Sequence, residues 1–230
     1  MRKLIYTILI LGLVSSSLNA KNYRAVPLEK ATLLKTGEEK MYCSICGMTL
    51  PMFYKTNHAS KHDGHDDQYC SITCEITDMI VNHRKMSDFR VVDNAKLSKT
   101  YLKFIDANKA FFVVGSKKPG TMSMISKYAF SDKSSAQKFQ KANGGKMMDF
   151  KELVAMVKAK LHKDLEATKK RQAKAIKMGQ MMYKKICQKI GEKFSSTAEA
   201  KSYLMQSKDC GNIRGKKLQA IGLYLVNRDK

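Results

Sequence analysis

Apolar residues between positions 41 and 150 occur in short runs that predict β-strands. The segments FRVVD (89–93), YLKFIDA (101–107) and AFFVVGS (110–116) are rich in β-branched and aromatic residues, as half-buried strands are. A short polar segment, residues 106–109, separates the last two runs. This arrangement predicts a hairpin with its turn at 106–109.

Helical patterns lie between and after these strands. Residues 70–85 predict a short helix, and residues 131–145 predict a second one that Ser131 or Asp132 caps and Gly144 ends. From Phe150 onward apolar residues recur at steps of three and four, which predicts a basic amphipathic helix with one apolar stripe. Three shorter helical segments are expected at 178–190, 197–208 and 215–228.

The elements together predict an α+β N-terminal domain, with short strands and two helices, followed by a small all-α C-terminal unit. We expect five segments, which are a signal peptide (1–20), a mobile lead-in (21–40), a metal-binding α+β domain (41–150), a basic amphipathic helix or linker (151–178) and a helical unit (179–230).

The first twenty residues predict export. Arg2 and Lys3 precede an apolar run of eleven residues, and small residues follow as far as Ala20. This is the layout of a Sec signal peptide, and the run is too short for a permanent membrane span. No cysteine lies in or just after the segment. We therefore expect cleavage near Ala20, a periplasmic location, and no stable membrane anchor.

The charge is strongly positive: 43 Lys and Arg stand against 20 Asp and Glu, a formal net charge of +23. A balance of this kind is typical of nucleic-acid-binding proteins. Export argues against a nucleic-acid partner, because the periplasm holds little of it. A solvated lysine-rich surface is the preferred interpretation, and contact with an anionic surface or an acidic partner is the alternative.

The six cysteines form an N-terminal set of four and a C-terminal pair, Cys187 and Cys210. Disulfides are the default for an even number of cysteines in an exported protein. The C-terminal pair would close a loop between two helical segments. We therefore predict a structural disulfide between Cys187 and Cys210.

The N-terminal set begins with the CxxC pair in MYCSICGM (41–48) and allows several kinds of chemistry. A redox dithiol needs its first cysteine at a helix N-terminus, where the helix dipole lowers the thiol pKa. Gly47 and Pro51 follow the pair closely and exclude such a helix. A thiol–disulfide oxidoreductase is therefore the weakest of the alternatives, although disulfides within the set stay open.

A metal site is the stronger interpretation of the same segment. The CxxC and CxxxC pairs, Cys43, Cys46, Cys70 and Cys74, suit a tetrahedral structural zinc site. Thiolate and thioether ligands instead select Cu(I), and imidazole can complete the site. The candidate ligands for copper beyond the cysteines are Met48, Met122, Met124 and His58. Any of the three methionines could equally be core filler.

The order of motifs CSICGMTL, QYCS, VVD, DANKAFFVVGS, GTMS and YAFSD across residues 41–150 resembles the NosL family of nitrous oxide reductase accessory proteins. The resemblance implies a small exported α+β domain that is not an enzyme. It also implies Cu(I) binding and delivery to the copper centres of nitrous oxide reductase or to other copper-handling proteins, as part of denitrification. By this resemblance Cys46 and Met122 are the expected soft ligands. The chain differs from typical members, which are lipoproteins, in lacking a lipobox cysteine, and it carries the additional Cys70 and Cys74.

The C-terminal segments MGQMMYKKIC and KKLQAIGLYLVN are similar to the first and last helices of a class I cytochrome c. Haem attachment needs a CxxCH motif, and Ile190 and Gly191 stand at the corresponding positions after Cys187. Covalent haem is therefore not expected. A helical cap without such ancestry is the alternative.

Overall fold

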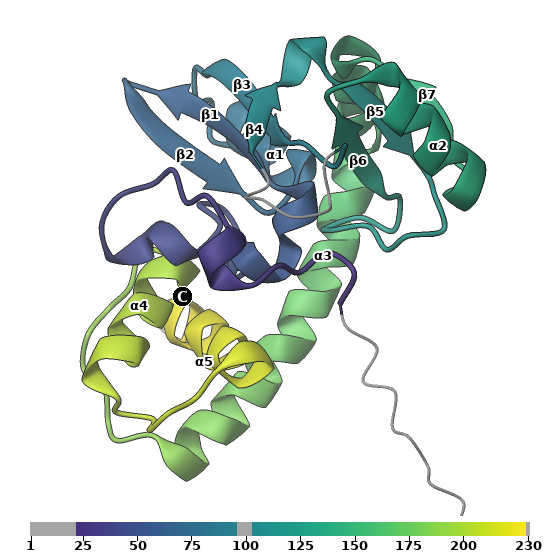
Figure 1. Ribbon diagram of the computed structural model, residues 1–230. Helices are drawn as coiled ribbons and strands as arrows, with labels where there is room; N and C mark the ends of the chain where they lie inside the picture. The colour runs from purple at the N-terminus through teal and green to yellow at the C-terminus, as the bar shows by residue number, and fades with distance from the viewer. Residues whose placement is uncertain (1–21, 96–102, 229–230) are drawn as a thin grey trace, which may run out of the picture.

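The computed structural model describes residues 22–95 and 103–228 (Figure 1). The predicted signal peptide and the first two residues of the predicted strand at 101–107 lie outside the described residues. The described parts have an α+β N-terminal region followed by a helical C-terminal region, as the sequence predicted.

Two antiparallel sheets form the N-terminal region (Figure 1). The larger sheet has the strand order β2-β1-β3-β4 and consists of β1 (His58–His62), β2 (His65–Tyr69), β3 (Ser87–Val92) and β4 (Phe104–Asp106). The smaller sheet has the order β6-β5-β7 and consists of β5 (Phe111–Val114), β6 (Lys127–Phe130) and β7 (Lys146–Met148). An isolated bridge between Asp93 and Ala129 joins them, and the Asp93 carboxylate accepts the backbone N–H of Ser131 at 2.9 Å.

The predicted hairpin over residues 104–114 is wrong. The strand β4 pairs with β3, whereas β5 pairs with β6 and β7. The Asp106 carboxylate accepts the backbone N–H of Asn108 at 2.9 Å and caps a 3₁₀ turn over Ala107–Lys109. This turn sends the chain from one sheet to the other instead of reversing it.

The helices are α1 (Ile72–Val81), α2 (Lys133–Asn143), α3 (Phe150–Ile186), α4 (Thr197–Ser207) and α5 (Gly215–Asn227). Asp132 caps α2 and Gly144 ends it, as predicted. Asp149 and Glu152 form a capping box at the start of α3, in which each side chain accepts the other residue's backbone N–H. Strong local start and stop signals therefore explain why these helix boundaries could be predicted.

The main core lies where α1 and α3 pack against the sheets. The apolar stripe of α3 contributes Phe150, Leu153, Val157 and Leu161, and these meet Phe112 and Val114 of β5 and Ile72 and Ile76 of α1. Burial of these side chains removes a large apolar area from water. It also fixes the N-terminal end of α1, where two of the cysteines lie.

Residues 22–40 were expected to be a mobile lead-in, but they pack on the domain. The backbone N–H of Val26 donates to the carbonyl of Pro51 at 3.0 Å, and Lys55 donates to the carbonyl of Arg24 at 3.1 Å. In Figure 1 this purple segment lies between the sheets and the pair α4 and α5.

The helix α3 connects the two regions without a break, so the predicted boundary between residues 178 and 179 falls inside one helix. Gly179 lets α3 cross α5 closely, because a Cβ there would come within 2.0 Å of the Ala220 carbonyl oxygen. Among residues 22–95 and 103–228, no helix is long and apolar enough to cross a membrane.

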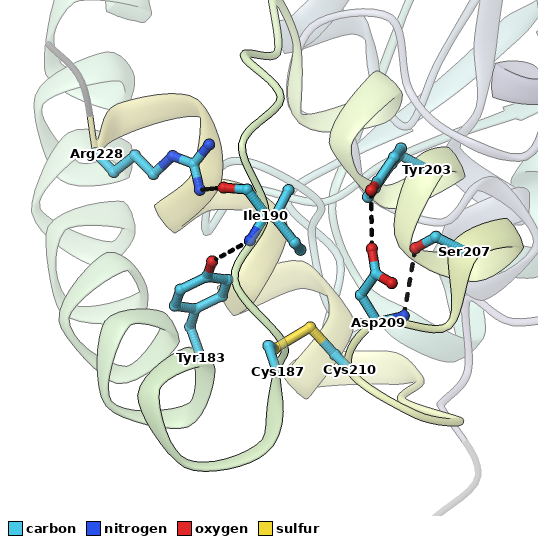
Figure 2. Close-up of a disulfide and its surroundings, with 8 residues drawn as sticks. All are labelled: Tyr183, Cys187, Ile190, Tyr203, Ser207, Asp209, Cys210 and Arg228. Atoms are coloured by element: carbon cyan, nitrogen blue, oxygen red, sulfur yellow. Dashed lines mark hydrogen bonds between the residues drawn. A yellow bond between two sulfur atoms is a disulfide. The ribbon is translucent and has the colours of Figure 1, made fainter.

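The disulfide between Cys187 and Cys210 is present and ties the end of α3 to the loop between α4 and α5 (Figure 2). Beside it, the Tyr183 hydroxyl accepts the backbone N–H of Ile190 at 2.8 Å, and Arg228 donates to the carbonyl of Ile190 at 2.8 Å. The segment between α3 and α4 is therefore held by a covalent link and by specific hydrogen bonds.

Candidate metal centre

The first two cysteines lie on a tight knuckle, residues 42–49. The backbone N–H of Cys43 donates to the carbonyl of Met48 at 2.9 Å, and Gly47 donates back to the carbonyl of Cys43 at 3.0 Å. Gly47 has φ 64°, in the left-handed region that favours glycine. Cys46 thus begins no helix, as the sequence predicted, and both thiols are turned toward the interior.

The other two cysteines come from the junction of β2 and α1. Cys70 directly follows β2, and Cys74 lies in the first turn of α1. The Thr56 hydroxyl lies 2.9 Å from the carbonyl oxygen of Cys70 and 2.8 Å from the Thr121 hydroxyl. The positive end of the α1 dipole favours negative charge on nearby sulfur atoms.

The fold brings the four thiols together into one buried cluster. Their sulfur atoms all lie within 4.8 Å of one another, and no cysteine of the cluster is more than 3% exposed. The sulfurs of Cys46 and Cys70 are 3.5 Å apart, and those of Cys70 and Cys74 are 3.7 Å apart. Tetrahedral coordination with metal–sulfur bonds of about 2.3 Å requires separations of roughly 3.8 Å. The cluster therefore fits a single thiophilic ion, with no disulfide needed to explain its compactness.

The pKa values of three of the thiols are shifted in different directions. Burial raises the pKa of Cys43, but hydrogen bonds from the thiols of Cys46, Cys70 and Cys74 outweigh burial and hold this pKa well below its usual value. Burial and the hydrogen bonds to Cys43 and Cys46 raise the pKa of Cys70. The hydrogen bonds to the other three thiols, and then burial, raise the pKa of Cys74. The arrangement thus favours negative charge on Cys43 over negative charge on Cys70 or Cys74.

A pocket of about 330 Å³ opens beside the cluster. Cys46 lines it together with three methionines, Met48, Met122 and Met124. Met48 and Met122 also pack against the cysteine cluster, whereas Met124 is 90% exposed. Cys46 is therefore the cysteine that belongs both to the buried cluster and to the open pocket.

Two arginines fix the loop that carries the methionines. Met122 has φ 63°, and its carbonyl accepts a hydrogen bond from Arg171 of α3 at 3.2 Å. Arg24 donates to the carbonyl of Gly120 in the same loop. These contacts hold the loop that places Met122 against the cluster.

The C-terminal unit closes over the knuckle. Gln219 of α5 donates to the carbonyl of Cys46 at 2.9 Å, and Lys201 of α4 donates to the carbonyl of Gly47. A Cβ on Gly47 would lie 2.7 Å from the side chain of Thr197, at the start of α4. The knuckle and the helical unit are thus in direct, close contact.

Of the predicted ligands, the structure gathers the four cysteines, Met48 and Met122, but His58 lies elsewhere. Its Nδ1 is 3.0 Å from a carboxylate oxygen of Glu75, and its ring stacks on Phe112. His58 lies at the start of β1, in the hairpin that β1 forms with β2. In the described ranges the metal-capable cluster consists of cysteines alone.

The sequence did not indicate four residues that donate hydrogen bonds to the backbone around the cluster, namely Lys201, Gln219, Arg24 and Arg171. Lys201 is one lysine in a lysine-rich chain, and its pairing with Gly47 spans 154 positions. No local pattern marks such a residue.

Comparison with known proteins finds similarity both to solved structures and to a protein family. Among solved structures, the copper chaperone NosL from Shewanella denitrificans aligns with a TM-score of 0.41 and 23% sequence identity. The alignment covers 55% of this chain and 96% of that chain. No curated protein matches the chain significantly. The NosL family profile matches residues 35–157, slightly more than half of the sequence and somewhat beyond the segment that carried the motifs. The chain therefore belongs to the NosL family.

Proposed function

We propose that the chain is an exported metallochaperone that binds Cu(I) at the cysteine cluster and passes it on by ligand exchange. One observation carries the proposal: Cys46 is shared between a buried four-thiol cluster and an open pocket lined by Met48 and Met122. Membership of the NosL family and the Cu(I) preference of thiolate and thioether ligands support it.

Transfer would proceed without release of the free ion. Cu(I) held by Cys46 and other thiolates of the cluster exchanges one sulfur ligand at a time for the thioether of Met48 or Met122. A soft ligand of the acceptor then enters the pocket and displaces Cys46 last. Copper stays in the +1 state throughout, and the vacated thiolates take up protons from water.

Membership of the NosL family supports a proposal about the acceptor. We propose that it is a copper centre of nitrous oxide reductase during its assembly in the periplasm, or another copper-handling protein there. The basic surface suits an acidic face on such a partner, since long-range attraction raises association rates.

A structural zinc site is the second candidate, and the burial of all four thiols favours it. Closed tetrahedral four-cysteine sites are typical of structural zinc, and their metal contributes directly to folding. In that case chelation would unfold the knuckle and α1, and the pocket beside Cys46 would have no role in metal exchange.

A competition titration under anaerobic conditions separates the two candidates. The chain without residues 1–20 is titrated with Cu(I) against a chromogenic Cu(I) chelator, and its zinc content is measured by elemental analysis. We expect one tightly bound Cu(I) per chain, weaker binding in Cys46→Ser and Met122→Leu, and unchanged binding in Met181→Leu, an exposed methionine of α3. Failure of the wild-type protein to compete with the chelator would contradict the proposed function, and stoichiometric zinc that copper cannot replace would favour the second candidate.

A further inference from the structure

A buried lysine lies beside the metal centre, and the hydrogen bonds of its ammonium group go to neutral groups. Lys201 is 0% exposed, and its ammonium group donates to the carbonyl of Gly47, to Gln219 Oε1 at 2.9 Å and to Thr49 Oγ1 at 3.3 Å. The same group lies 4.1 Å from the centre of the Tyr42 ring. All of these contacts are to neutral groups, and they form a site shaped for a cation.

Burial lowers the pKa of Lys201 to about 7, and negative charge on Cys46 and Cys43 opposes that shift. Within residues 22–95 and 103–228, no Asp or Glu forms an ion pair with it. A buried charge is costly unless an opposite charge compensates it. The cysteine cluster is therefore the group that can compensate Lys201, and Lys201 can compensate the cluster.

We propose that Lys201 is a positioning residue that acts as the buried counter-cation of the metal-loaded cysteine cluster. The inference rests on the proposed function. It assigns a role at the metal centre to the C-terminal unit, which lies beyond the family match at residues 35–157. Lys201 does not bind the metal. It holds the Gly47 carbonyl and places one positive charge next to the thiolates.

The charge of the loaded cluster gives this role a measurable consequence. Four thiolates with Cu(I) carry a net charge of −3, and the same four thiolates with Zn(II) carry −2. A neighbouring positive charge therefore favours the Cu(I) form more than the Zn(II) form, for any given set of thiolates.

The test removes the charge and compares two metals. Lys201→Met and Lys201→Gln are measured beside Lys217→Met, which removes the same charge from the exposed surface of α5. Affinities for Cu(I) and for Zn(II) are determined by chelator competition. We expect both Lys201 variants to lose about tenfold or more in Cu(I) affinity, as loss of groups just beyond the ligands commonly does. Zn(II) affinity should fall less, and Lys217→Met should match the wild type for both ions.

If the Lys201 variants lose equal affinity for Cu(I) and Zn(II), the proposal is overturned and Lys201 has only a packing role. Unchanged affinities for both ions would overturn it in the same way. Partial misfolding reduces the number of sites but not the affinity ratio of the folded fraction, and the Lys201→Gln variant keeps a donor for the Gly47 carbonyl. If the wild-type protein itself fails to bind Cu(I), the proposed function fails. The Zn(II) affinities of Lys201→Met and Lys217→Met then decide the role of Lys201, and equal values would refute it.

Discussion

The two sets of cysteines are held in place by different means. In the C-terminal unit, Cys187 and Cys210 are joined covalently, and the link closes the chain between α3 and α5. In the N-terminal region the four thiols are as close as 3.5 Å but are free, and the backbones of the knuckle, β2 and α1 position them. Cysteines placed by the surrounding fold rather than by their own bond remain able to bind a metal. The C-terminal pair is therefore a structural crosslink, whereas the four N-terminal thiols are available for metal binding.

The two regions also depend on each other. The disulfide-linked unit supplies Lys201 and Gln219 to the knuckle, and α3 supplies Arg171 to the loop of Met122. Substitutions in each region test whether the disulfide pair is structural and the four free thiols bind metal. They are given below from the largest expected effect to the smallest.

Loss of one thiol from the cluster should have the largest effect. We expect Cys70→Ser to lower Cu(I) affinity more than 100-fold, since even partners of metal ligands contribute roughly 10- to 100-fold. The double variant Cys187→Ser/Cys210→Ser should stay within about threefold of the wild type. Chelator competition measures both, and equal losses in the two variants would remove the distinction between the sets.

The same double variant should instead lose stability. The disulfide spans 23 positions, and closing a loop of this length stabilises a protein by about 3 kcal/mol in the chain-entropy account. Urea unfolding of the metal-free protein, followed by circular dichroism of the helices, measures the change in the free energy of unfolding. A stability equal to that of the wild type would show that packing alone holds the C-terminal unit.

The contact between the two regions can be tested at a glycine. Gly47→Ala should destabilise the protein by about 1–3 kcal/mol, because it combines a left-handed backbone with a close approach to Thr197. Gly211→Ala is the matched control, since Gly211 has φ 68° with no atom within 4 Å of the added Cβ. Thermal unfolding should show the larger loss for Gly47→Ala, and similar losses would mean that the α4 contact adds nothing.

A second buried lysine, Lys127, sharpens the comparison further. Lys127 of β6 has neutral hydrogen-bond partners, Ser123 Oγ at 2.7 Å and the carbonyl of Ile125 at 3.1 Å, and burial lowers its pKa to about 8. The folded protein releases this proton near pH 8, whereas the unfolded chain keeps it to about pH 10.5. Between these values the unfolded state binds more protons, so stability rises with pH.

We expect this lysine to contribute about 1 kcal/mol of added stability between pH 7.5 and pH 9. Urea unfolding of wild type and Lys127→Met at the two pH values measures the contribution as the difference between their slopes. The same slope in both proteins would show that Lys127 is not the group that titrates.

The sequence could predict those parts of the fold and the centre that rest on local signals. Short sequence patterns indicate three such parts, which are the capped helices, the CxxC turn with Gly47, and the soft side chains of Met48 and Met122. The predicted hairpin failed because the Asp106 cap redirects the chain and because partners elsewhere compete for each strand. His58 was a candidate ligand by its residue type, but strand pairing and its contact with Glu75 hold it away from the cluster. Lys201 could not be predicted at all, since its role comes from a contact across 154 positions.

X-ray absorption at the copper edge of the Cu(I)-loaded protein tests the central claim most directly. The account predicts a Cu(I) edge and a first coordination shell of sulfur alone, with the Cys187–Cys210 disulfide still intact by thiol counting. A first shell with nitrogen ligands, or copper bound only after the C-terminal disulfide is reduced, would contradict it.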